Sequence, residues 1–284
     1  MIGRFAIFFE FLFARLSEKH RRAFSLGFAL GSYSVLPADR LGPKSKDRFS
    51  LYQLGPMKLL LDGTNLIDKW VVRRGWENVQ RATLFSLVEQ VRATCDQRLI
   101  FLDVGAHWGF YSLAAFHSAC FDEIHAFEAD PINHAQLQAQ LLLNNAIPAI
   151  EAHKFVVTAV RGDLPWMLSS ESVPSNRGGV GVDERAGLMI AGRPLDAVFK
   201  PSDAVVVMKI DVEGHEREVI HGARRLLSRS KAIVQVESVV SFADDVSAAL
   251  GAMGYRKISQ HSHDHFFTNI DGLVDTGEDS KAPA

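Results

Sequence analysis

The sequence predicts an α/β protein built on a doubly wound, mostly parallel sheet. From residue 99 onward, short apolar runs alternate with amphipathic segments of helical length. The apolar runs are almost continuous, as expected of strands that are buried on both faces of a sheet. Because strands that alternate with helices form parallel sheets through right-handed crossovers, we expect helices on both faces.

Each element follows from its own local pattern. Apolar runs rich in branched residues predict five strands, at 99–104, 123–128, about 153–160, 204–210 and 232–237. Helical periodicity predicts helices at 110–118, 131–145, 215–228 and 241–253. Pro131 supports the second of these helices, since proline favours the first turn of a helix.

Two regions interrupt this alternation. Residues 161–203 are rich in Gly, Ser and Pro, which predicts an insertion of small strands and loops that shapes a substrate pocket. Residues 1–98 form an extension, read as helical over 1–36, a loop over 37–50, small strands with a hairpin turn over 51–75, and a helix over 79–94. The main domain then covers 99–275, and a flexible polar tail covers 276–284.

Composition narrows the class of protein and its compartment. The 284 residues are 47% hydrophobic and 23% charged, which is ordinary for a globular protein. Cys95 and Cys120 form no CxxC pair, which argues against a disulfide framework or a thiolate metal site and fits the reducing cytoplasm. No basic run with interleaved aromatic residues indicates a nucleic-acid groove, so we expect no nucleic-acid partner.

The amino-terminal segment is basic and rich in Phe. Residues 1–98 hold 16 Lys and Arg against 9 Asp and Glu, whereas 99–284 hold 15 against 24. The apolar run at the start is shorter than the roughly 20 residues of a membrane-spanning helix. Two interpretations of residues 1–22 stay open: a helix docked on its own domain or on a second copy of the chain, and a helix lying in the inner surface of a membrane.

Candidate ligand-binding residues cluster after three predicted strands, at 103–109, 127–130 and 209–216. In an open parallel sheet, ligands bind beyond the carboxyl ends of the strands. After the first strand, Gly105 and Gly109 bracket a loop, and glycine lets the backbone approach a ligand closely. A tight turn with no ligand is the alternative interpretation of this loop.

The second strand end indicates the kind of ligand. Glu128, 25 residues after Asp103, can accept hydrogen bonds from both hydroxyls of an adenosine ribose. A nicotinamide dinucleotide would use such an acid too, but its pyrophosphate needs the spacing GxGxxG. Here the bulky His107 and Trp108 lie in the loop, and Asp103 would repel a phosphate. The balance favours an adenosyl cofactor without phosphates, whose methionine ammonium Asp103 can hold.

Five stretches of the chain resemble the FkbM family of methyltransferases: DVGAHWGFYSL (103–113), FEADPINHAQLQAQLLLNN (127–145), PLDAV (194–198), KIDVEGHEREVIHGA (209–223) and IVQVES (233–238). They occur in the right order over 99–238, and KIDVEG is the most specific. The resemblance implies the class I methyltransferase (Rossmann-like) fold, with a seven-stranded sheet and an antiparallel last strand. It also implies bound S-adenosylmethionine and O-methylation of a hydroxyl on a sugar or natural product. His107 departs from the family's DVGAN loop, which leaves its role open.

The residues expected to bind the cofactor lie at or near these strand ends: Asp103, Gly105, Ala106, His107, Gly109, Phe127, Glu128, Ala129, Ala159 and Asp211. A hydroxyl acceptor, of a saccharide, glycolipid precursor or other small molecule, also needs a base to take its proton. His215 has an ordinary pKa near neutrality, and Asp211 and Glu213 could serve if burial raises their pKa. Glu237 could orient either base or bind a sugar hydroxyl. These alternatives are left unranked.

The sequence also allows other functions and one other site. A nicotinamide-dependent oxidoreductase is disfavoured by the loop sequence, and a non-catalytic binding module would act through residues 1–98. His261, His263 and His265 would share one face of a strand and could present a metal site. A solvent-exposed turn between the last two strands is the favoured placement, so no metal site is expected.

Overall fold

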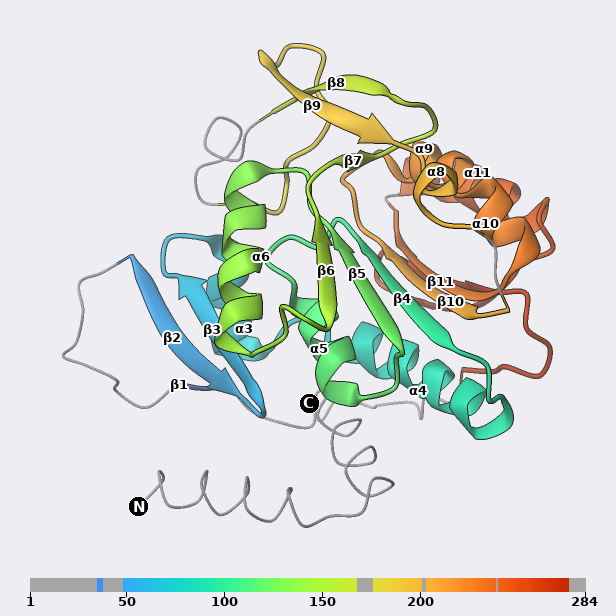
Figure 1. Ribbon diagram of the computed structural model, residues 1–284, viewed down its shortest axis with the longest axis horizontal. Helices are drawn as coiled ribbons and strands as arrows, with labels where there is room; N and C mark the ends of the chain where they lie inside the picture. Colours follow the sequence, from blue (N-terminus) through green and yellow to red (C-terminus); the bar gives the residue numbers. More distant parts are fainter. Residues whose placement is uncertain (1–34, 38–47, 168–175, 201–202, 239, 276–284) are drawn as a thin grey trace.

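A seven-stranded sheet forms the centre of the protein, with its strands in the order β12-β13-β11-β10-β4-β5-β6 (Figure 1). The structure is a computed structural model that describes residues 35–37, 48–167, 176–200, 203–238 and 240–275. The strands are β4 (Leu99–Val104), β5 (Glu123–Phe127), β6 (Ile150–His153), β10 (Val205–Ile210), β11 (Lys231–Glu237), β12 (Arg256–His261) and β13 (Asp264–Thr268). β13 is antiparallel to both of its neighbours, β11 and β12, and the other pairs of adjacent strands are parallel. The predicted mostly parallel sheet with an antiparallel last strand is therefore confirmed.

Both faces of this sheet are covered by helices. Successive residues of a strand point to opposite faces. Phe101 and Val207 share a buried cluster with residues of α4 (Asn78–Thr94), α5 (Phe110–Ser118) and α6 (Pro131–Leu143). Leu102 and Met208 share another with residues of α9 (Glu216–Gly222), α10 (Arg224–Arg229) and α11 (Val240–Gly251). The doubly wound arrangement therefore follows from the continuously apolar strands.

Two predicted elements were wrong in their bounds. The third strand of the sheet is β6, four residues long and ending at His153, rather than a strand over 153–160. The apolar residues that follow include β7 (Val156–Val157), which pairs with the insertion instead. An apolar run indicates that a segment is buried, but it does not indicate which strand the segment pairs with. The predicted bounds of 153–160 were wrong for this reason. The helix predicted at 215–228 is divided at Ala223 into α9 and α10.

The insertion contains small strands, as predicted. β8 (Gly162–Trp166) and β9 (Leu188–Arg193) are antiparallel, and β7 joins β9 in parallel to complete a three-stranded sheet. The short helix α8 (Leu195–Val198) leads back to the main sheet. In Figure 1 this small sheet lies at the end of the main sheet where β6 leads into β7. It therefore lies beside the carboxyl ends of the parallel strands.

The amino-terminal region adds another three-stranded sheet, made of β1 (Val35–Pro37), β2 (Phe49–Leu54) and β3 (Met57–Asp62). The outer edge of β3 would expose unpaired backbone groups. Side-chain amides of α6 and of its C-cap residue satisfy two of them: the backbone N–H of Leu60 donates to Gln140 Oε1 (2.8 Å), and that of Lys58 to Asn144 Oδ1 (2.8 Å). This edge of the extension is therefore joined to the main domain by hydrogen bonds.

The described part of the extension confirms one predicted element and corrects two others. The hairpin within 51–75 is confirmed, but the end of that segment is a helix, α3 (Leu66–Arg74), and not a strand. Val35–Pro37 is a strand rather than the end of a helix. The helix predicted for the residues before it, the membrane or oligomer contacts of 1–22, and the tail 276–284 lie outside the described residues.

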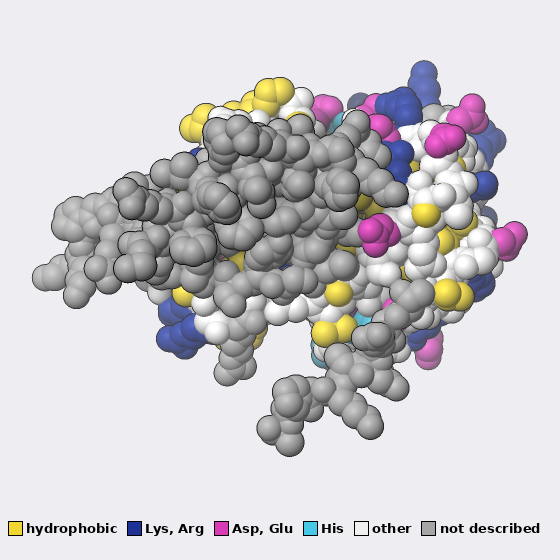
Figure 2. All heavy atoms as spheres, turned by 90° about the horizontal axis from the view of Figure 1, so that it is seen from below, with side chains coloured by type: hydrophobic (Ala, Val, Ile, Leu, Met, Phe, Trp, Pro, Cys, Tyr) yellow, Lys and Arg dark blue, Asp and Glu magenta, His cyan; other side chains and the backbone are white. Residues whose placement is uncertain are grey.

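The described surface carries charges of both signs. At the upper right and right of the face shown in Figure 2, Lys and Arg side chains are interspersed with Asp and Glu side chains. Such a mixture is ordinary for a globular surface. In the parts of the chain that the structure describes, no helix combines the length and the apolar character needed to cross a membrane.

Candidate active site

The three strand ends singled out from the sequence meet at one cavity of about 260 Å³. Eleven of the predicted site residues line it: Asp103, Gly105, Ala106, His107, Phe127, Glu128, Ala129, Asp211, Glu213, His215 and Glu237. Gly109 and Ala159 do not line it. The wall near Ala159 is formed instead by Phe155, Val156 and Val157, because the chain leaves the main sheet at His153.

The loop after β4 folds tightly against the neighbouring strand ends. The backbone N–H groups of Gly105 and Ala106 both donate to the carbonyl oxygen of Phe127. Gly105 has φ 81°, and a Cβ there would overlap the backbone of Asp211. Gly109 has φ 89°, and a Cβ there would overlap the side chain of Leu137. The chain's own packing thus accounts for both glycines, whether or not a ligand binds.

His107 lies in this loop with a left-handed backbone, at φ 52°. Its backbone N–H donates to Glu128 Oε2 (2.7 Å). Burial lowers the pKa of the ring to about 3, so the imidazole is neutral at physiological pH. Its Nε2 atom is buried and has no hydrogen-bond partner among the described residues. A buried polar atom of this kind in a cavity wall is suited to a bound polar group.

Two buried acids follow β4 and β5. Glu128 is 5% exposed, and its second oxygen, Oε1, accepts the N–H of Asp130 (2.8 Å). Burial raises the pKa of Glu128 to about 8. Asp103 is 1% exposed, and its Oδ2 accepts both the backbone N–H (3.0 Å) and the hydroxyl (2.6 Å) of Ser112. Each carboxyl group keeps acceptor capacity beyond these bonds.

Two of the carboxylates that line the cavity, Asp211 and Glu237, form a group with Glu77, which does not line it. We call Glu77, Asp211 and Glu237 the anionic cluster, since one carboxylate oxygen from each lies within 4.8 Å of the others. Lys209 is 4% exposed, and its Nζ donates to Asp211 Oδ2 (2.7 Å). The Tyr111 hydroxyl donates to Glu77 Oε2 (2.7 Å). One lysine therefore balances part of the charge of three carboxylates.

The crowding of these charges shifts their titration. Asp211 and burial raise the pKa of Glu237 above its ordinary value, and burial raises that of Glu77. Although burial opposes it, the attraction of Asp211 and its neighbours raises the pKa of Lys209. Partial burial and Asp211 also raise the pKa of Glu213 to about 7. Carboxyl groups in this cavity can therefore exchange protons near neutral and alkaline pH.

His215 also lines the cavity, but its ring is engaged with a neighbour. Its Nε2 lies 3.0 Å from the hydroxyl oxygen of Thr158, so the two share a hydrogen bond. Burial lowers the pKa of His215, which keeps the ring neutral. The structure therefore places this histidine where it can bind a polar ligand.

Sequence reasoning missed Glu77 and an aromatic pair. Trp70, in α3, and Trp76, in the loop after it, both line the cavity. Their rings are stacked, with centroids 5.5 Å apart and planes 18° apart. All three residues come from the extension, far from the motifs in the chain, and nothing in their local pattern indicates a site. Trp108 and Trp166 line the same cavity while being mostly buried.

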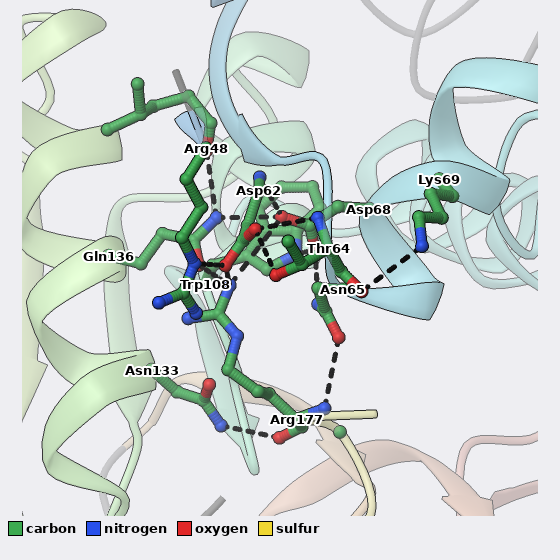
Figure 3. A network of polar contacts seen from close by, with 12 residues as sticks. Arg48, Asp62, Thr64, Asn65, Asp68, Lys69, Trp108, Asn133, Gln136 and Arg177 are labelled. Carbon is green, nitrogen blue, oxygen red and sulfur yellow. Dashed lines mark hydrogen bonds and ion pairs between the residues drawn. The ribbon is translucent and has the colours of Figure 1, made fainter. Parts of the chain in front are cut away.

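A buried polar network fixes the insertion next to this site (Figure 3). Arg177, 3% exposed, lies 3.3 Å from Asp62 Oδ2 and 3.8 Å from Asp68 Oδ2, and its Nη2 donates to Gln136 Oε1 (2.7 Å). Trp108 Nε1 donates to Asp68 Oδ1 (3.0 Å). One set of interactions thus holds residues of the extension, α6, the loop after β4 and the insertion.

The histidines near the end of the chain do not form a common site. His261 Nε2 lies 2.9 Å from the hydroxyl of Thr83 and 3.0 Å from that of Ser259. His263 lies in the turn between β12 and β13, as predicted, but His265 is buried on β13 and not exposed to solvent. Among the described residues, these three histidines do not converge on one position.

Comparison with known proteins gives one matching family. Residues 103–257 match the sequence model described as the methyltransferase FkbM domain. No curated protein matches the chain. The matched segment covers more than half of the chain, from the end of β4 to the start of β12.

Many solved structures are similar to the chain, including the following three. The FkbM methyltransferase from Methylobacillus flagellatus KT is 18% identical with a TM-score of 0.46, over 61% of this chain and 43% of that one. The precorrin-6y C5,15-methyltransferase from Geobacter metallireducens GS-15 is 14% identical with a TM-score of 0.38, over 65% and 84%. The ribosomal protein L11 methylase from Lactobacillus delbrueckii subsp. bulgaricus is 13% identical with a TM-score of 0.41, over 67% and 77%. The match therefore spans less than half the length of the first of these proteins.

Proposed function

This chain belongs to the FkbM methyltransferase family, and on that premise we propose that it methylates a hydroxyl group of a saccharide, with S-adenosylmethionine as the methyl donor. The observation that supports the proposal is the set of side chains that one cavity brings together. That cavity holds a buried acid suited to a ribose, a group of carboxylates beside a lysine, and a stacked pair of tryptophans.

The residues of the cavity fit an adenosyl cofactor. Each oxygen of Glu128 accepts one backbone N–H, which leaves each able to accept a ribose hydroxyl. Phe127 and Phe155 supply apolar walls of the kind that an adenine ring prefers. We assign the methionine end to Asp103 and to the unpartnered Nε2 of His107. A dinucleotide is disfavoured because Asp103 and His107 offer no site for a pyrophosphate.

The chemistry asks the protein to position the acceptor and to take one proton. When bound, S-adenosylmethionine supplies an electrophilic methyl group. We assign to Glu237 the role of the base that takes the proton of the acceptor hydroxyl, because its raised pKa lies closer to the working pH. Lys209 compensates the charge of Asp211 beside it, and Glu77 completes the anionic cluster. Glu213 and His215, on the same wall, are assigned to binding of the acceptor.

The walls of the cavity support a saccharide as the acceptor. A pyranose ring has an apolar face that packs on aromatic rings and hydroxyls that donate to carboxylates. Trp70 and Trp76 provide the first kind of contact, and the anionic cluster provides the second. A polysaccharide or glycolipid precursor is the class of acceptor that we propose, handled in the cytoplasm.

Glu128→Ala is expected to weaken binding of S-adenosylhomocysteine by about 10²-fold, since two hydrogen bonds to the ribose are lost at about 1.5 kcal/mol each. Calorimetric titration of the purified chain measures this affinity. Glu89→Ala, which changes an exposed glutamate of α4, is the matched control and should leave the affinity unchanged. Unaltered binding in Glu128→Ala, or stabilisation by NADH but not by S-adenosylhomocysteine, would overturn the cofactor assignment.

Trp76→Leu and Trp70→Leu are each expected to raise the KM for the acceptor by up to about tenfold, because an aromatic contact contributes about 1 kcal/mol. Transfer of labelled methyl groups to a panel of monosaccharides and oligosaccharides provides the assay. Trp76→Phe should retain most of the acceptor affinity, and the affinity for S-adenosylhomocysteine should not change. A variant that loses cofactor affinity but not acceptor affinity would contradict the assignment of this wall.

A further inference from the structure

A second cluster of potential ligands lies on the outer strands of the main sheet. His125 is on β5, and Glu151 and His153 are on β6, the strand at the edge of the sheet. The parallel register pairs His125 with Glu151 and Phe127 with His153. We call His125, Glu151 and His153 the edge cluster. None of its residues lines the cavity described above.

The atoms of the edge cluster have the separations of a zinc site. His125 Nδ1 lies 3.2 Å from His153 Nε2 and 3.4 Å from Glu151 Oε2, and His153 Nε2 lies 3.8 Å from Glu151 Oε1. Ligands at about 2.0–2.1 Å from a tetrahedral zinc ion are separated by about 3.3–3.4 Å from one another. An ion can therefore occupy the space between these three side chains with little rearrangement.

Neighbouring residues hold both rings in place. The His153 ring stacks on Phe127, with centroids 4.6 Å apart and planes 10° apart, and the His125 ring meets Phe199 edge-on at 4.7 Å. His125 Nε2 is buried, has no hydrogen-bond partner among the described residues, and lies 3.7 Å from Glu123 Oε2. A carboxylate beside the outer nitrogen favours a proton there, which leaves Nδ1 free to coordinate a metal.

We propose that the edge cluster binds one zinc ion through His125 Nδ1, His153 Nε2 and the Glu151 carboxylate, with water as the fourth ligand. Two imidazoles and a carboxylate suit zinc, whereas magnesium and calcium prefer oxygen ligands alone. Glu151 is 66% exposed at its side chain, so an ion can enter from solvent. This site is independent of the methyl-transfer proposal.

Bound zinc would join β6 to β5 through side chains. β6 has only four residues, so few backbone hydrogen bonds hold this edge. The carbonyl oxygen of His153 accepts the backbone N–H of Glu128 (3.0 Å), which places the zinc site next to the proposed ribose acid. We therefore expect zinc to raise the thermal stability of the protein, as a structural ion does.

The test uses the full chain, freed of metal with a chelator and titrated with ZnCl₂ against a chromogenic competitor. We expect one zinc ion per chain, and a rise in Tm on its addition. Glu151→Gln alters an exposed side chain, so it should fold normally in the absence of metal and bind zinc at least about tenfold more weakly. His125→Asn should abolish the site. His263→Asn, at an exposed histidine elsewhere, is the control for non-specific binding.

The zinc titrations of the unmodified chain and its variants either support the proposal or overturn it. Stoichiometric binding that is weakened by Glu151→Gln and lost in His125→Asn supports the proposal, provided that His263→Asn binds as the unmodified chain does. Absence of binding at micromolar zinc, or equal binding by Glu151→Gln with a normal metal-free Tm, overturns it. If His125→Asn fails to fold, the comparison between Glu151→Gln and the unmodified chain decides alone. In the overturning case, the two histidines are joined by a direct hydrogen bond.

Discussion

Glu237→Gln is expected to lower kcat by about 10²- to 10⁴-fold, because glutamine cannot take the proton of the acceptor hydroxyl. The affinity for S-adenosylhomocysteine should stay near that of the unmodified chain, since Glu237 lies at the end of β11, across the cavity from the proposed ribose acid Glu128. Steady-state assays with varied acceptor, together with calorimetry of the cofactor product, measure the two quantities.

The pH dependence separates this role from a structural one. Asp211 and burial hold the pKa of Glu237 above the ordinary value of 4.5, so the basic form appears only as the pH rises. The rate should therefore increase with pH through the neutral and alkaline range in the unmodified chain. In Glu237→Gln this increase should disappear. A variant that keeps both the rate and the pH profile would show that another group takes the proton.

Thermal stability provides a second readout for Glu237→Gln. A carboxyl group whose pKa is raised by folding favours the folded state while it is protonated, and this contribution is lost as the pH rises. The glutamine variant has no such loss, so at pH 8 its Tm should equal or exceed that of the unmodified chain.

His215→Asn and Glu213→Gln are the comparison variants for the role of Glu237 as the base. If either lowers kcat as much and removes the same pH dependence, the base is that residue instead.

Arg177→Met is expected to reduce the free energy of unfolding by about 3–5 kcal/mol, because it leaves two buried aspartates without their shared cation. Arg177 contacts both Asp62 and Asp68, and all three side chains are at most 3% exposed. Denaturant unfolding monitored by tryptophan fluorescence gives the change. Because Trp108 donates to Asp68, we also expect weaker binding of S-adenosylhomocysteine.

Arg185→Met is the matched control for this prediction. Arg185 also pairs with an aspartate, Asp183 (2.6 Å), but its side chain is 85% exposed. Exposed ion pairs contribute little, so the change should stay below about 1 kcal/mol. Similar losses in the two variants would mean that burial does not decide the importance of Arg177. A stable Arg177→Met chain would show that the network is not what holds the insertion.

Local pattern was sufficient for most of the central sheet. β4, with six consecutive buried residues, has the predicted bounds of 99–104, because a strand between two layers of helices must be apolar on both faces. The pattern wrongly predicted a strand of the main sheet over 153–160. Residues there are apolar because they are buried in the wall of the cavity, which gives the same sequence pattern as burial in a sheet. The division of the helix over 215–228 at Ala223 was missed as well.

Some residues of the candidate site could likewise be predicted from the sequence, and others could not. Asp103, Glu128 and Asp211 could be found because topology brings the carboxyl ends of parallel strands to one edge, whatever the rest of the chain does. Trp76, which lines the cavity, and Glu77, which lies behind its wall beside Asp211 and Glu237, could not, since only the docking of the extension brings them there. Their closeness in space to the other site residues is set by tertiary packing, which no local period encodes.

The sequence by itself therefore determined the sheet, the family and the strand-end residues, whose places follow from local periodicity and chain order. Only the tertiary structure decided which residues of the extension complete the cavity, why Gly105 and Gly109 are required, and that His125 meets His153. These are contacts between segments far apart in the chain. They depend on register and packing across several elements, and the two-residue or 3.6-residue period of one element carries no information about them.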